Sequence, residues 1–167
     1  VPPERWDHGR FHAAEASGPE RTPYKWGGFM PDADRFDPVF FGISGREAEA
    51  MDPQQRVFLE ACYHALEDAG YAGPSVRLAR HCGVFAGVEP GDYLQLCTDA
   101  TPEGRAPLFQ GNAESILAAR ISYFLDLSGP SLAVNTACSS SLVAIHLACR
   151  SLQQGDCALA LAGGVRV

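Results

Sequence analysis

The feature that most constrains the fold is a strand–turn–helix–strand pattern between residues 131 and 164. Residues 131–134 form an apolar run, a turn of small residues follows, and residues 139–154 carry apolar side chains at helical spacing. Gly155 ends this helix, and a second apolar run occupies residues 157–161, just before a pair of glycines. A strand–helix–strand unit implies two parallel strands joined by a right-handed crossover. The sequence therefore predicts an α/β fold.

Upstream of this unit, helical and extended patterns alternate. Asp52 is a good helix N-cap and Pro53 suits a first turn, so a helix is predicted from there to Gly70. Residues 82–88 are an apolar run bounded by polar residues and are predicted to form a buried strand. The remaining predictions are a short helix at 92–97, a polar loop at 98–107, and a helix at 113–125 that buries Ile116, Leu117, Ile121, Phe124 and Leu125.

The start of the chain has a different character. It is rich in proline, glycine and aromatic residues and has neither helical nor alternating periodicity. We expect an irregular arm at about residues 1–45 and an α/β core at about 46–167. A flexible linker is the alternative, but linkers rarely contain so many large aromatic side chains. The arm is expected to pack through Trp6, Trp26, Phe29, Phe36, Phe40 and Phe41.

Charge and hydropathy disfavour several classes of function. The 167-residue chain has a net charge of −7, whereas nucleic-acid binding needs a basic surface. No apolar run approaches the ~20 residues that span a bilayer, and no signal-peptide pattern is present. The six cysteines lack the spacing of a zinc site or of a small disulfide scaffold. We therefore expect reduced thiols in a cytoplasmic protein and no bound metal.

Cys138 is the candidate nucleophile. It lies where the strand 131–134 ends and the following helix begins, and functional groups gather at such junctions. A helix N-terminus stabilises a thiolate, and free N–H groups of its first turn can face an oxyanion. The small neighbours Ala137, Ser139 and Ser140 let a substrate approach closely. By itself this position is only suggestive, because a free cysteine in such a turn is more often structural.

No histidine is well placed by the sequence to act as the partner that thiolate chemistry usually needs. His146 follows Cys138 by eight residues on the same predicted helix, which puts it ~12 Å along the axis at ~1.5 Å per residue. That separation is beyond hydrogen-bond reach. Cys138 therefore works without a base or uses one outside this chain. The other histidines are in the arm, within a helix or before a strand: His8, His12, His64 and His81.

The segment around Cys138 reads VNTACSSSLVAIHLAC at residues 134–149. It closely resembles the active-site signature of ketosynthases of type I modular polyketide synthases, and the match continues to Val165. Residues 2–7, 36–70 and 111–123 resemble further blocks of that family in the same order. Residues 115–120 are also similar to those of synthases whose acyltransferase is a separate protein. The departures are Asn135 where Asp is common, Gly45 where Pro is common, and Tyr63-His64 where Trp-Glu is frequent.

The resemblance implies the thiolase fold, in which two similar α/β halves, each with a mixed five-stranded sheet, are stacked with helices between and outside them. Residues 1–167 are then most of the first half, a partial β-ketoacyl synthase N-terminal half. The family's opening strand and its second half are expected outside this chain, since Val1 is not a Met and Val167 directly follows a strand. The second half carries two histidines, a lysine and a Gly-rich loop with another oxyanion donor.

By the same resemblance, the intact domain is an acyltransferase that performs decarboxylative Claisen condensation. Cys138 takes an acyl group from a phosphopantetheine thioester on an acyl carrier protein and holds it as a thioester, and its own N–H contributes to an oxyanion hole. A malonyl-type extender then loses CO2, and the resulting carbanion attacks that thioester. The chain itself is expected to bind no cofactor, and to contact neither membrane nor nucleic acid. A homodimer interface is expected near residues 109–115.

Two other functions stay open at this point. One is a non-elongating or purely structural half-domain with no turnover of its own. The other is a cysteine hydrolase, which requires a nearby histidine and access for water. A condensing enzyme is distinguished by a His-Gly-Thr-Gly-Thr-like stretch and a later Lys…Gly-His stretch further along the native sequence.

Overall fold

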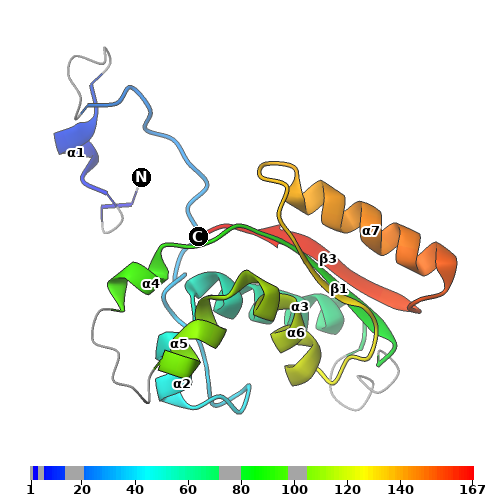
Figure 1. The fold of residues 1–167 in the computed structure, drawn as a ribbon. Helices are drawn as coiled ribbons and strands as arrows, with labels where there is room; N and C mark the ends of the chain where they lie inside the picture. Colours follow the sequence, from blue (N-terminus) through cyan, green and yellow to red (C-terminus); the bar gives the residue numbers. More distant parts are fainter. Residues whose placement is uncertain (1, 4–5, 14–20, 72–79, 98–104) are drawn as a thin grey trace. The chain divides into compact units, whose positions relative to one another are not determined.

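The computed structural model of the chain divides into two units, Val1–Ala33 and Asp34–Val167. In the second unit, helices cover both faces of a parallel sheet (Figure 1). None of the described helices combines the length and the apolar character needed to cross a bilayer. The residues that the structure describes are 2–3, 6–13, 21–71, 80–97 and 105–167.

Within the described residues the sheet has three strands, all parallel, in the order β2–β1–β3. The central strand β1 is Cys82–Val88, and every residue in it is buried, as its continuous apolar sequence predicts. Its neighbours are β2, Ser131–Val134, and β3, Leu159–Val165. Strand β3 begins two residues later than the predicted 157–161, and it ends later because its two glycines continue the pairing with β1.

The predicted strand–helix–strand unit is present, with β1 lying between its two strands. Helix α7, Ser140–Gln154, joins β2 to β3 across one face of the sheet (Figure 1). Helices α3, Pro53–Asp68, and α6, Glu114–Phe124, lie on the opposite face. Side chains alternate along β1, so that Phe85 packs with α7 while Val84 packs with α3 and α6.

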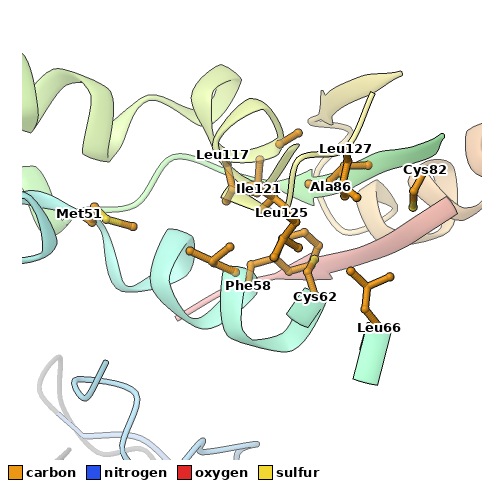
Figure 2. Packing of buried hydrophobic residues seen from close by; sticks show 14 of the residues in the cluster. Met51, Phe58, Cys62, Leu66, Cys82, Ala86, Leu117, Ile121, Leu125 and Leu127 are labelled. Carbon is orange, nitrogen blue, oxygen red and sulfur yellow. The ribbon is translucent and has the colours of Figure 1, made fainter. Parts of the chain in front are cut away.

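The main hydrophobic core fills the space between β1 and helices α3 and α6 (Figure 2). Each large side chain buried there stabilises the fold by about 1.5–3 kcal/mol relative to an exposed one. The predicted buried side of residues 113–125 is confirmed for Leu117, Ile121 and Leu125, whereas Ile116 and Phe124 are only partly buried. The core side chains marked in Figure 2 are Met51, Phe58, Cys62, Leu66, Cys82, Ala86, Leu117, Ile121, Leu125 and Leu127.

Capping side chains set the starts of two helices in the second unit. The Asp52 carboxylate accepts a hydrogen bond from the Gln54 N–H at 2.8 Å, which confirms the predicted start of α3. Ser44 caps α2, Gly45–Ala50, by accepting from the Glu47 N–H at 3.2 Å. Helix α2 is absent from the sequence-based expectations, although Ser-x-x-Glu is the spacing of a capping box.

Two helices flank residues 98–104, which lie outside the described residues. Helix α4, Tyr93–Leu96, is the predicted short helix. Helix α5, Arg105–Asn112, begins inside the predicted polar loop, so that prediction is wrong for residues 105–107. The reason is long-range: the Asn112 side-chain amide donates to the Ala50 carbonyl at 3.0 Å and ties the end of α5 to α2.

Helix α7 buries small side chains rather than its apolar stripe. A helix that covers a sheet usually turns its apolar side inward. Here Leu142 is 70% exposed and Ile145 is 45% exposed. Small residues let the helix backbone lie close to the sheet. The residues on the sheet side of α7 are Ser140, Ala144, Ala148 and Ser151.

Among its described residues, the first unit contains one helical turn, α1, His8–Phe11, within the segment expected to be irregular. Trp6 stacks on Phe11 with a ring-centroid separation of 6.0 Å. Trp26, which was expected to pack, is 86% exposed. The backbone at residues 23–30 forms neither helix nor strand that would cover it.

Three aromatic residues of the expected arm belong to the second unit instead. Phe36 and Phe41 stack with centroids 5.3 Å apart, and Phe40 meets Tyr63 of α3 edge to face at 4.9 Å. These contacts attach the segment before α2 to the core helix α3.

Candidate active site

Cys138 lies in the turn that joins β2 to α7, and its side chain is exposed. It lines a hollow of about 350 Å³ at the carboxyl ends of the strands. The junction that the sequence predicts around Cys138 is therefore present. The other lining residues come from the end of β1, the turn, the first turn of α7 and the end of β3: Gly87, Val88, Glu89, Ala137, Ser140, Ser141, Gly164, Val165 and Arg166.

The turn that carries Cys138 has a strained backbone. Ala137 has a φ of 54°, and this left-handed conformation costs a residue with a side chain about 1–2 kcal/mol. The Ser140 hydroxyl offsets the strain by accepting from the Thr136 N–H at 2.8 Å and donating to the Ala137 carbonyl at 2.7 Å. Ser139 also donates to the Thr136 carbonyl, at 2.8 Å. These serines, which the sequence marks only as small, hold the turn in place.

Two glycines let α7 approach the ends of β1 and β3. A Cβ atom on Gly87 would lie 2.7 Å from the backbone of Ser140 and of Ser141. A Cβ atom on Gly164 would lie 2.7 Å from the Ser141 Cβ. Only residues without a side chain permit contacts this close. The sequence gives no sign of this role, because both glycines lie in or next to ordinary apolar runs.

Charged groups meet at the rim of the hollow. Arg166 donates from Nη1 to the Pro90 carbonyl at 2.7 Å and lies 4.0 Å from the Glu89 carboxylate. Of the residues that the structure describes, no histidine lines the hollow. His64 pairs with a glutamate of its own helix at 2.9 Å, and His146 is exposed on α7. A base for Cys138 is therefore not supplied by these side chains.

The whole sequence fits one protein family. A family model described as the N-terminal domain of beta-ketoacyl synthase matches residues 1–167. The chain belongs to this family. Among its curated relatives, this β-ketoacyl synthase chain is 54% identical to polyketide synthase ThaG of Burkholderia thailandensis and 50% identical to polyketide synthase PksM of Bacillus subtilis. These matches cover 100% and 99% of the chain but only 3% and 4% of those much longer proteins.

Solved ketosynthase structures share the fold. The β-ketoacyl synthase chain matches the oxazolomycin ketosynthase domain OzmH KS7 of Streptomyces albus JA3453 with a TM-score of 0.80 and 44% identity. It matches the ketosynthase from module 6 of the bacillaene synthase of Bacillus subtilis 168 with a TM-score of 0.77 and 39% identity. Both matches cover the whole chain but only 29% and 26% of the neighbours. The fold is thus the α/β, thiolase-like fold that the resemblance implies, present in part.

Burial distinguishes the cysteines of this β-ketoacyl synthase chain. All six are free, and desolvation raises the pKa of Cys62 to about 12 and that of Cys82 to about 11. A thiol with a pKa far above the solution pH stays protonated and reacts poorly. We expect iodoacetamide at neutral pH to label the exposed Cys138 and Cys149, and to label Cys62 and Cys82 only after unfolding. Peptide mass spectrometry checks this, and rapid labelling of Cys62 in the folded protein would contradict it.

Proposed function

We propose that this chain is the acyl-carrying part of a ketosynthase in polyketide biosynthesis, with Cys138 as the nucleophile. The observation that carries the proposal is an exposed thiol at the start of α7, in the wall of a hollow of about 350 Å³. The names of the relatives, polyketide synthases and ketosynthases, support the class of reaction.

In the first half-reaction, Cys138 Sγ attacks the carbonyl carbon of an acyl thioester on the phosphopantetheine of an acyl carrier protein. A bond from that carbon to Sγ forms, and the bond to the pantetheine sulfur breaks. The released pantetheine thiolate takes up the proton that Cys138 gave up. The Cys138 N–H, in the turn just before α7, donates to the oxyanion of the tetrahedral intermediate. Gly87 and Gly164 line the same hollow as Cys138.

In the second half-reaction, a malonyl-type extender on a carrier protein loses CO2. The electron pair of the broken carbon–carbon bond forms an enolate, whose carbon attacks the Cys138 thioester. A new carbon–carbon bond forms, Sγ leaves as a thiolate, and the β-ketoacyl chain stays on the carrier. By the resemblance, the histidines and the lysine that assist these steps belong to the second half of the domain. We therefore expect residues 1–167 alone not to condense.

We further propose that residues 1–167 form most of the first half of the domain, which acts as a homodimer in the cytoplasm. The support for a partial domain is that the chain spans under a third of each solved ketosynthase chain described above. The chain brings no cofactor of its own in this proposal, since phosphopantetheine arrives on the carrier protein. Acyl and malonyl-type thioesters are its substrates.

The proposal is tested on the intact protein with an acyl-pantetheine thioester followed by malonyl carrier protein. We expect the acyl mass on the peptide that contains Cys138, and then a β-ketoacyl carrier product. Acylation without product would favour the non-elongating alternative, and no acylation would overturn the proposal. A β-ketoacyl product from the 167-residue chain alone would show that the second half is not needed for condensation.

A further inference from the structure

The Asn135 side chain connects the Cys138 turn to helix α6, because it accepts one hydrogen bond within the turn and donates another to α6. Its Oδ1 accepts from the Ala137 N–H at 3.2 Å. Its Nδ2 donates to the Glu114 carboxylate at 3.3 Å. The first bond closes a local turn over the left-handed Ala137, directly before Cys138. The second bond reaches 21 residues back along the chain to the first turn of α6.

Glu114 is the first residue of a helix that packs in the core. Helix α6 packs against the sheet through Leu117 and Ile121, each only 1% exposed. The first turn of a helix is also where a negative side chain is electrostatically favoured. The core therefore holds the backbone of α6 in place, and the bond from Asn135 to Glu114 ties the turn to this helix.

Only an amide satisfies both bonds. An aspartate at position 135 would still accept from the Ala137 N–H, but its second oxygen would face the Glu114 carboxylate, and like charges at this distance repel. This gives a physical reason for Asn135 in a chain that carries Glu114, although the resembling family commonly has Asp there. We propose that Asn135 is a positioning residue, which fixes the turn before Cys138 by pairing with Glu114. The inference rests on the proposed function, in which Cys138 is the nucleophile.

The test measures Cys138 alkylation by iodoacetamide in the intact protein. Cys149 is the internal reference, because it is exposed on α7 and away from the turn. We expect Asn135→Asp to lower the Cys138-to-Cys149 rate ratio about tenfold, because the new carboxylate repels the Glu114 carboxylate and the turn loses its anchor. Adding Glu114→Gln restores the ratio to within about twofold of the unaltered protein, since glutamine donates to the new carboxylate.

Two further variants separate this pairing from a general loss of structure. Asn135→Ala loses both hydrogen bonds and lowers the ratio about fivefold, and Glu114→Gln does not restore it. Glu114→Gln alone costs at most about twofold, because glutamine keeps an acceptor for the Asn135 amide. An unchanged ratio in Asn135→Asp, or a loss that is the same with Glu or Gln at position 114, overturns the proposal. Normal alkylation of Cys138 without acyl transfer would instead count against the proposed function alone.

Discussion

Replacing Cys138 with alanine in the intact protein should abolish acyl loading, with a fall in rate of at least about a thousandfold. The thioester needs a nucleophile that faces the hollow, and within its described wall Cys138 is the one residue with a sulfur atom. Ser140 lies beside it, but the Ser140 hydroxyl is held in the hydrogen bonds of the turn. The measurement is the mass of the protein after incubation with an acyl-pantetheine thioester.

Cys149→Ala is the matched control for this substitution. Both cysteines are exposed, one at the turn before α7 and the other within the same helix, and both substitutions remove one sulfur atom. Exposed changes of this kind usually alter stability by less than about 0.5 kcal/mol. We therefore expect Cys149→Ala to load at the unaltered rate. Loading that survives Cys138→Ala, or that is lost in Cys149→Ala, would place the acyl anchor elsewhere.

The elements that the sequence predicts correctly carry strong local signals. Residues 82–88 are continuously apolar, and a short run of this kind is typical of a strand buried on both faces, as β1 is. Asp52 and Pro53 start a helix through their own backbone geometry and hydrogen bonding, without help from distant residues. The strand–turn–helix pattern around Cys138 is also a local signal, and it correctly predicts that Cys138 lies at the edge of the sheet.

What the sequence leaves unpredicted depends on contacts between distant residues. Periodicity reveals the apolar stripe of α7 but not which side meets the sheet, and Ala144, not Leu142, is buried there. The left-handed Ala137 has no signal in its residue type, because glycine is the usual choice for that conformation. The hydrogen bond from Asn135 to Glu114 depends on how α6 packs against the sheet in the folded chain. Each of these features helps to position Cys138.

Gly87→Ala should displace the first turn of α7, which follows Cys138, because Gly87 of β1 lies directly against that turn. The new Cβ would lie 2.7 Å from backbone atoms of both Ser140 and Ser141, and 2.9 Å from the Ser140 carbonyl oxygen. Alanine gains about 0.5–1 kcal/mol over glycine within a strand, but overpacking costs about 1–3 kcal/mol. The clash wins because backbone atoms cannot rotate away. We expect a lower thermal unfolding midpoint and Cys138 acylation slowed at least about tenfold.

Gly163→Ala is the control for the effect of adding a methyl group to a strand of this sheet. On Gly163, the new Cβ would meet only the Phe58 ring, at 3.4 Å, which is ordinary van der Waals contact. We expect a change in stability below about 1 kcal/mol and unaltered acylation. If Gly87→Ala unfolds and acylates like Gly163→Ala, the close approach of β1 to α7 does not position Cys138. If only Gly87→Ala slows acylation, the geometry of the nucleophile depends on the close packing of Gly87 against α7.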